Sequence, residues 1–136
     1  MAEDEHGNAN VAFVREWAEG FNRGETGSLA ERADPEIEWV VAREHPAATI
    51  HVGIEAIQRY LGDWRQTLPG MRMELDRIEA FGDKVLAVGE ISGTGAESGV
   101  GIGVQIAFVS TYEGERVVRV EEYLDPAEAE RAAGAG

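Results

Sequence analysis

The chain has 136 residues with 26 acidic and 12 basic side chains, which give a formal net charge of -14. A chain of this size can bury a substantial core as one domain, and its negative charge disfavours nucleic acids and anionic membranes as partners. It has no cysteine, which excludes disulfides and cysteine-bound zinc, and no apolar segment long enough to span a bilayer, so we expect a soluble cytoplasmic protein.

An amphipathic helix is predicted first, after a flexible acidic segment over residues 1–9. Apolar side chains recur at helical spacing from Asn10 to a stop at Gly24, and Asn8 or Asn10 supplies the cap. The apolar stripe consists of Val11, Val14, Trp17, Ala18 and Phe21. We expect this stripe to pack on the core.

A short helix, a strand and a polar loop are predicted next. The helix covers residues 28–33 and ends before Pro35, because the residue before a proline avoids the helical conformation. Alternating residues over 37–41 predict a strand with one buried face. Residues 43–49 are mostly polar and predict a loop.

A third helix is predicted over residues 54–68, where apolar residues recur at spacings of three and four. These residues are Ile54, Ile57, Leu61, Trp64 and Leu68. Pro69-Gly70 ends the helix, because a proline cannot continue it.

The remaining sequence predicts antiparallel strands over residues 71–80, 85–93, 104–112 and 116–124. The apolar positions of the first of these strands change parity near Asp76, so we expect a β-bulge there. The glycine-rich segment 93–103 predicts a flexible hairpin. Its glycine spacing does not match a dinucleotide-binding loop, and a strand follows it where such a loop would need a helix.

A short helix and a frayed tail are predicted over residues 127–136. Asp125 can cap this helix, with Pro126 at its first position. Together the elements predict an α+β fold in one domain over residues 10–126, with three N-terminal helices packed into a strongly bent, mostly antiparallel sheet.

Four segments of the chain carry a resemblance to a known family. They are residues 14–25 (VREWAEGFNRGE), 37–41 (IEWVV), 51–57 (HVGIEAI) and 116–125 (RVVRVEEYLD). They resemble the SnoaL-like, or polyketide cyclase-like, family of the nuclear transport factor two-like superfamily, which implies a cone-shaped half-barrel. Members include isomerases, cyclases, epoxide hydrolases, dehydratases and proteins without catalytic activity, so the resemblance indicates a fold and not a reaction.

The resemblance also implies a homodimer, because members of this superfamily commonly dimerise through the convex face of the sheet. Residues 104–109 are apolar on both faces of their predicted strand. That pattern agrees with a sheet that is covered on both sides.

Two well-known active sites of the superfamily do not transfer to this chain. The residues that ketosteroid isomerase uses fall on Trp17, Trp39 and Phe108, none of which can take a proton from carbon. Limonene-epoxide hydrolase resembles the chain at Glu122, but its partner arginine and second aspartate fall on a glycine and an isoleucine. Both reactions are therefore disfavoured.

The resemblance places six aromatic residues around a predicted ligand cavity. They are Trp17, Trp39, Tyr60, Trp64, Phe108 and Tyr112. Ala87, Gly89 and Gly93 share one strand parity and would leave room beside these rings, which suits an apolar, planar or polycyclic ligand. The alternative is that the rings fill the core of a small domain.

Glu122 is the first candidate for catalysis. Alternation along residues 116–124 directs Glu122 inward and Glu121 outward. Burial among rings raises the pKa of a carboxyl group and suits it for proton transfer near neutral pH. The alternative is a structural role, in which Glu122 accepts from a buried donor or pairs with Arg43 or Arg72.

His45 is the second candidate, because it lies in the loop after the first strand, where the cone would open. It could donate to a ligand carbonyl or carry a proton, and the alternative is a solvated loop residue. His45, His51 and Glu44 lack a recognised metal-ligand spacing, so we expect neither a metal nor a cofactor.

Three functions remain open for this chain. The first is a cofactor-independent isomerase, cyclase or hydrolase in which Glu122 transfers a proton on a small, largely apolar cyclic substrate. The second is a binding protein without catalytic activity that uses the same cavity. The third is a dimeric assembly module whose cone is filled by side chains.

Overall fold

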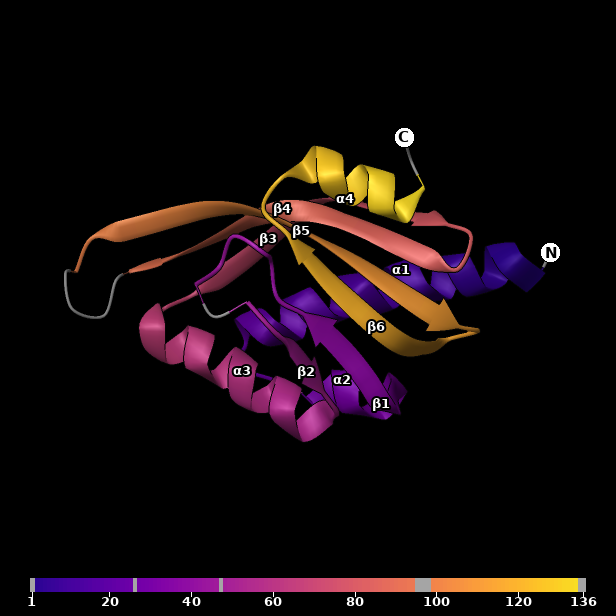
Figure 1. The fold of residues 1–136 in the computed structure, drawn as a ribbon, viewed down its shortest axis with the longest axis horizontal. Helices are drawn as coiled ribbons and strands as arrows, with labels where there is room; N and C mark the ends of the chain where they lie inside the picture. The colour runs from indigo at the N-terminus through magenta and orange to yellow at the C-terminus, as the bar shows by residue number, and fades with distance from the viewer. Residues whose placement is uncertain (1, 26, 47, 95–98, 135–136) are drawn as a thin grey trace.

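The computed structural model describes residues 2–25, 27–46, 48–94 and 99–134, with side chains from His6 onward (Figure 1). Its elements are α1 (Ala2–Asn22), α2 (Gly27–Arg32), β1 (Ala33–Val40), β2 (Ile50–Val52), α3 (Ile54–Thr67), β3 (Arg72–Phe81), β4 (Lys84–Thr94), β5 (Gly101–Glu113), β6 (Arg116–Tyr123) and α4 (Pro126–Ala133). The predicted α+β architecture is confirmed.

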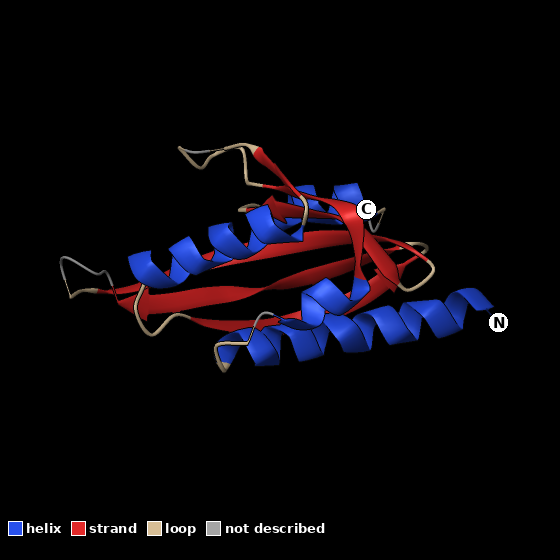
Figure 2. Cartoon of the chain, turned by 90° about the horizontal axis from the view of Figure 1, so that it is seen from below, coloured by secondary structure: helices blue, strands red, loops and turns tan. Residues whose placement is uncertain are grey.

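One sheet joins the described strands in the order β2-β1-β6-β5-β4-β3. Its neighbouring pairs are antiparallel except for β1 and β6, which run parallel. The sheet is bent, and Figure 2 shows α1 and α3 on its near side with α4 behind it. The bent, mostly antiparallel sheet expected from the sequence is therefore confirmed.

A β-bulge interrupts β3 where the sequence predicts one. The pairing of β3 with β4 shifts register between Leu75 and Arg77, which leaves Asp76 as the extra residue. Gly89 faces this bulge, and a Cβ at Gly89 would lie 2.0 Å from the carbonyl oxygen of Glu74. The close approach of the two strands therefore requires glycine at this position.

Helix α1 is longer than predicted and begins at Ala2. Asn10 is 3% exposed, its side-chain amide donates to the carbonyl oxygen of Gly114 at 3.0 Å, and its side-chain oxygen accepts from Arg32 at 3.4 Å. The cap predicted at Asn8 or Asn10 is therefore wrong. Asn10 lies within the helix and ties it to the turn between β5 and β6.

One strand was not predicted, and another begins earlier than expected. β2 has three residues and pairs with β1 at the edge of the sheet. We expected a loop and the start of a helix over these three residues. β1 begins at Ala33 and runs through Pro35. The proline is tolerated because the pairing of β1 with β6 is interrupted between Ala33 and Glu38.

Apolar clusters cover both faces of the sheet. The larger cluster lies between the sheet and helices α1 to α3. The cluster on the opposite face consists of Leu86, Val88, Ala107, Val109, Ala129 and Ala133. Here α4 covers β4 and β5, so the two-sided apolar pattern of residues 104–109 is met in part within the chain and does not require a second copy.

The predicted cap of α4 is confirmed. The Asp125 carboxylate accepts from the backbone N–H of Ala127 at 2.9 Å, and Pro126 lies in the first turn. Within the described residues, none of the helices has both the length and the apolar content needed to cross a membrane.

Candidate functional site

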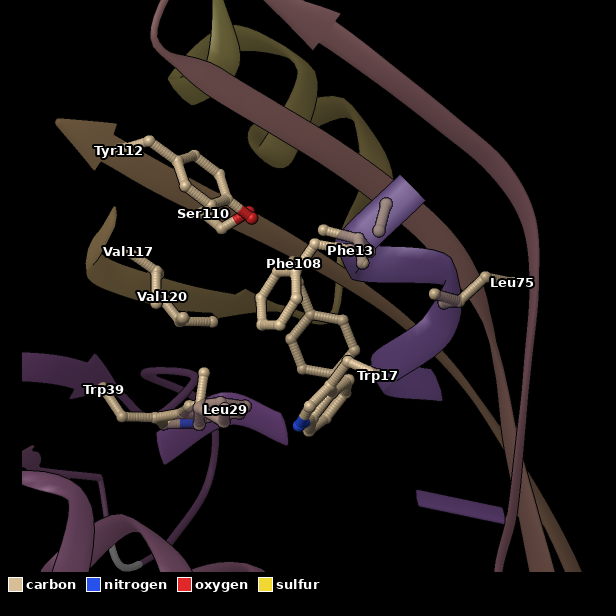
Figure 3. Close-up of a pocket in the computed structure, with 12 residues that line it drawn as sticks. Phe13, Trp17, Leu29, Trp39, Leu75, Phe108, Ser110, Tyr112, Val117 and Val120 are labelled. Atoms are coloured by element: carbon tan, nitrogen blue, oxygen red, sulfur yellow. The ribbon is translucent and has the colours of Figure 1, made fainter. Parts of the chain in front are cut away.

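Among the described residues, the interior of the cone encloses a small cavity of about 40 Å³. Its wall includes four of the predicted ring residues, and Figure 3 shows Phe13 and Trp17 of α1 facing Phe108 of β5 across it. The four are Trp17, Trp39, Phe108 and Tyr112. An engineered apolar cavity of about 150 Å³ binds benzene. The inner cavity is therefore too small for a ring-shaped ligand, and these four rings belong to the core.

A larger cleft of about 340 Å³ lies beside α3. Its apolar wall is formed by Leu68, Met71, Ile91, Val104, Ile106 and Leu124, together with the ring of Trp64. Its polar groups come from His45, Tyr60, Asp63, Thr67 and Glu122. Small-molecule sites are concave, mostly apolar and equipped with a few polar groups, and this outer cleft fits that description.

The glycines predicted to leave room beside the rings do not open a cavity. A Cβ on Gly89 would meet the main chain of Glu74, and a Cβ on Gly93 would lie 3.1 Å from the Cβ of Leu68. Neighbouring backbone and side chains therefore fill the space that both glycines leave. Of the three small residues, Ala87 alone lines the inner cavity.

Trp39 separates the inner cavity from the outer cleft. Its ring centroid lies 6.0 Å from that of Trp17 and 5.9 Å from that of Phe108, on the inner side. On the other side, it lies 6.3 Å from Tyr60 and 6.4 Å from Trp64, which both line the cleft. The six predicted rings are therefore split between two spaces instead of enclosing one.

Glu122 lies at the wall of the outer cleft and is 6% exposed, as the alternation of β6 predicts. Its Oε2 accepts from the indole N–H of Trp39 at 2.5 Å and from the hydroxyl of Tyr60 at 2.7 Å. Its Oε1 accepts from the backbone N–H of Ala42 at 3.3 Å. Three uncharged donors from β1, α3 and the loop after β1 thus hold the carboxylate.

Burial raises the pKa of the Glu122 carboxyl above its ordinary value of 4.5, because the charged form loses its hydration. The bonds from Trp39, Tyr60 and Ala42 and the charge of His45 act in the opposite direction and limit the rise. Burial, followed by the negative charge of Glu122, raises the pKa of the Tyr60 phenol. Tyr60 therefore keeps its proton and acts as a donor to Glu122.

The arginines proposed as partners of Glu122 lie elsewhere. Arg43 forms ion pairs with Glu44, at 3.2 Å, and with Glu128. Arg72 pairs with Glu74 at 3.4 Å. Within the part of the chain that the structure describes, no arginine or lysine forms an ion pair with Glu122. Of the two structural roles considered for Glu122, the structure therefore agrees with acceptance from buried neutral donors and not with an arginine pair.

The histidines do not gather into a metal site. His45 lines the outer cleft and acts electrostatically on Glu122, whereas His51 stacks on the Tyr60 ring with centroids 4.6 Å apart. Among the described residues, no group of three or more histidine and carboxylate side chains is arranged to hold a metal ion.

Two polar features of the site were not foreseen. Asp63 lines the cleft, and its spacing of three from Tyr60 and four from Thr67 on a predicted helix could have revealed it. The backbone N–H of Ala42 carries no sequence signal, because any residue other than proline can supply it.

The fold recurs in solved structures of low sequence identity. An NTF2-like protein of unknown function from Burkholderia pseudomallei superimposes with a TM-score of 0.76 at 20% identity, covering 92% of this chain and 97% of that one. Bal32a, from a soil-derived mobile gene cassette, gives a TM-score of 0.76 at 23% identity, with coverage of 86% and 89%. TerC, crystallised together with polyporic acid, gives 0.74 at 18% identity, with coverage of 93% and 98%.

Comparison of sequences gives the family directly. No curated protein matches the chain. The sequence profile of the SnoaL-like domain, however, matches residues 14–120, which include the second part of α1, helices α2 and α3 and most of the sheet. The family expected from the resemblance is confirmed, and the chain belongs to the SnoaL-like domain family.

Proposed function

We propose that this protein binds a small, largely apolar cyclic molecule in the outer cleft, with the polar end of the ligand at Glu122. The observation that carries this proposal is a carboxylate, 6% exposed, at the wall of an apolar cleft of about 340 Å³. Burying a carboxylate is costly, and a structural role alone does not need a cleft beside it.

The two oxygens of Glu122 are unequally occupied. Oε2 accepts two short hydrogen bonds, whereas Oε1 holds one bond of 3.3 Å, near the outer limit for an N–H donor. A carboxylate oxygen has two lone pairs, so Oε1 can accept a further hydrogen bond or a proton from a ligand. The hydrogen bonds from Trp39 and Tyr60 fix the orientation of the carboxylate, while Oε1 accepts from the ligand.

Proton transfer is the reaction that this arrangement supports best. The Glu122 carboxylate takes a proton from the carbon next to a ring carbonyl, and the electron pair of the broken C–H bond passes into the enolate. His45 donates to the enolate oxygen from the cleft wall. The new carboxylic acid then returns the proton to the same or another carbon, which exchanges or isomerises the ligand without a cofactor. The raised pKa of Glu122 suits both steps.

The comparisons support the binding half of this proposal. The chain belongs to the SnoaL-like domain family, and one structural neighbour, TerC, was crystallised with a small molecule, polyporic acid. The mainly apolar cleft wall and the adjacent rings of Tyr60 and Trp64 suit a cyclic partner.

Proton exchange on 2-tetralone in heavy water tests the reaction. We expect the protein to accelerate loss of the ketone's α-proton signals in NMR spectra, and Glu122→Gln to slow this exchange by about 100-fold. Tyr112→Phe, which alters the inner cavity only, is the matched control and should exchange at the wild-type rate. Equal rates with wild type and Glu122→Gln would rule out proton transfer by Glu122.

A carrier without catalytic activity is the second candidate, and the same cleft supports it. It predicts that 2-tetralone binds to wild type and to Glu122→Gln without accelerated exchange in either. The assembly-module alternative predicts no room for a ligand. The inner cone is nearly filled, as that alternative requires, but the outer cleft is open, so the alternative has less support. The homodimer expected from the resemblance stays a prediction, and α4 covers part of the convex face through which it would form.

A further inference from the structure

We infer that the ligand of the outer cleft carries a positive charge, as a protonated amine attached to or near a ring. This inference rests on the proposed function and names the chemical class of the molecule bound at that site. It comes from the charges that line the cleft and from those that are directed away from it.

The charged side chains of the cleft are mostly acidic. Glu122 lies at its buried wall and Asp63 on its exposed side, and His45 is the one basic residue among the described lining residues. A buried carboxylate without an arginine or lysine partner gains most from a ligand that brings the missing positive charge. A carboxylic acid ligand would instead place like charges side by side.

Two arginines near the cleft, Arg65 and Arg43, are engaged elsewhere. Arg65, on the same helix as Asp63, donates to the carbonyl oxygen of Phe21 at 2.6 Å and lies over the Phe21 ring. Arg43 forms ion pairs with Glu44 and Glu128. Neither guanidinium is therefore placed to receive an anionic ligand in the cleft.

Aromatic rings add a second attraction for a cation. Tyr60 and Trp64 both line the cleft, with ring centroids 5.2 Å apart and planes inclined at 67°. An ammonium group near the face of such a ring is attracted by its quadrupole. The chain's net charge of -14 adds a long-range field that concentrates cations and repels anions.

The pH dependence of amine binding follows from the groups that face the cleft. Glu122 attracts the ammonium group when it is ionised, and the Tyr60 phenol stays neutral. Asp63 and His45 are the other acidic and basic side chains of the described cleft lining. Arg59 lines a neighbouring hollow together with Tyr60 and Asp63. Amine affinity should therefore rise as the pH increases through the raised pKa of Glu122.

Three naphthalene probes of similar size and different charge test the inference by isothermal titration calorimetry. They are 1-naphthylmethylamine, 1-naphthalenemethanol and 1-naphthoate. We expect the amine to bind about tenfold more tightly than the alcohol, and the acid to bind most weakly. Asp63→Asn and Glu122→Gln should each reduce the preference for the amine.

Glu16→Gln is the matched control, because Glu16 is an exposed residue of α1 outside the cleft, and its loss changes the net charge equally. It should leave the preference for the amine unchanged. Asp63 is exposed, so Asp63→Asn tests the inference even if Glu122→Gln folds poorly. If the alcohol or the acid binds as tightly as the amine, the charge inference fails and the proposed binding site stands. If none of the probes binds, both fail.

Discussion

The inner cavity and the outer cleft are built from the same kind of side chain and differ in what they can hold. Trp17, Phe108 and Tyr112 surround a space of about 40 Å³, whereas Tyr60 and Trp64 line one of about 340 Å³. Trp39 contacts both groups of rings. The polar groups also differ, because the described lining of the inner cavity carries uncharged groups, namely the Ser110–Tyr112 hydroxyl pair and two indole N–H groups, whereas the cleft has a buried carboxylate.

This difference shows that an aromatic residue in a cone fold does not by itself indicate a ligand. The rings of α1 and β5 pack against one another and fill the hydrophobic core. Tyr60, which donates to the buried carboxylate of Glu122, and Trp64 instead line the outer cleft. The two roles can be separated experimentally by stability and by binding.

Phe108→Ala should have the largest effect on stability. The ring is 6% exposed and contacts Trp17 and Trp39, so we expect a loss of about 3–5 kcal/mol in the free energy of unfolding, measured by urea denaturation. The fraction that remains folded should still bind 1-naphthylmethylamine. Lost binding in folded protein would show that the inner rings belong to the ligand site.

Trp64→Ala should weaken ligand binding more and destabilise the fold less than Phe108→Ala does. Trp64 is partly buried on the cleft wall, so we expect a smaller loss of stability, about 2 kcal/mol, together with about tenfold weaker binding of the same amine. Calorimetric titration and urea denaturation of one preparation measure both. A stability loss equal to that of Phe108→Ala, with unchanged affinity, would make Trp64 a core residue.

The pH dependence of stability should distinguish the buried carboxylate from a neutral replacement. The pKa of Glu122 is raised on folding, so the folded protein holds this proton at pH values where the unfolded chain has released it. This stabilisation is fully present below about pH 4.5 and is lost as the pH rises through the raised value. Relative to Glu122→Gln, wild type should therefore lose stability as the pH rises, by at most about 1.4 kcal/mol per pH unit. Parallel curves would contradict the raised pKa.

The sequence predicted those features that depend on local periodicity. Spacings of three and four gave α3, a change of parity gave the bulge at Asp76, and alternation gave the burial of Glu122. β2 was missed because three residues carry too little pattern, and its pairing with β1 decides its structure. The start of α1 was misplaced because Asn10 is a good capping residue that is used for a tertiary contact instead.

The partners of Glu122 could not be predicted, for a different reason. Trp39, Tyr60 and Ala42 come from separate elements, and 62 or more residues separate each of them from Glu122. The division of the rings between two spaces depends on how much volume packing leaves, and a residue pattern does not encode that volume. Alternation can therefore indicate that a carboxylate is buried without indicating what holds it.

Tyr60→Phe should have the smallest effect and is the most specific test of the Glu122 site. It removes one hydroxyl that donates to Oε2 at 2.7 Å and keeps the ring on the cleft wall, so we expect a loss of about 1 kcal/mol in stability. The lost bond favours the charged form of Glu122, so its removal should raise the pKa of Glu122 further. The indole N–H of Trp39 bonds to the same oxygen, and a pH titration of tryptophan fluorescence should therefore show a midpoint that moves upward in Tyr60→Phe and disappears in Glu122→Gln. A midpoint that stays in Glu122→Gln would belong to another group, and an unchanged midpoint in Tyr60→Phe would mean that the hydroxyl does not control the carboxylate.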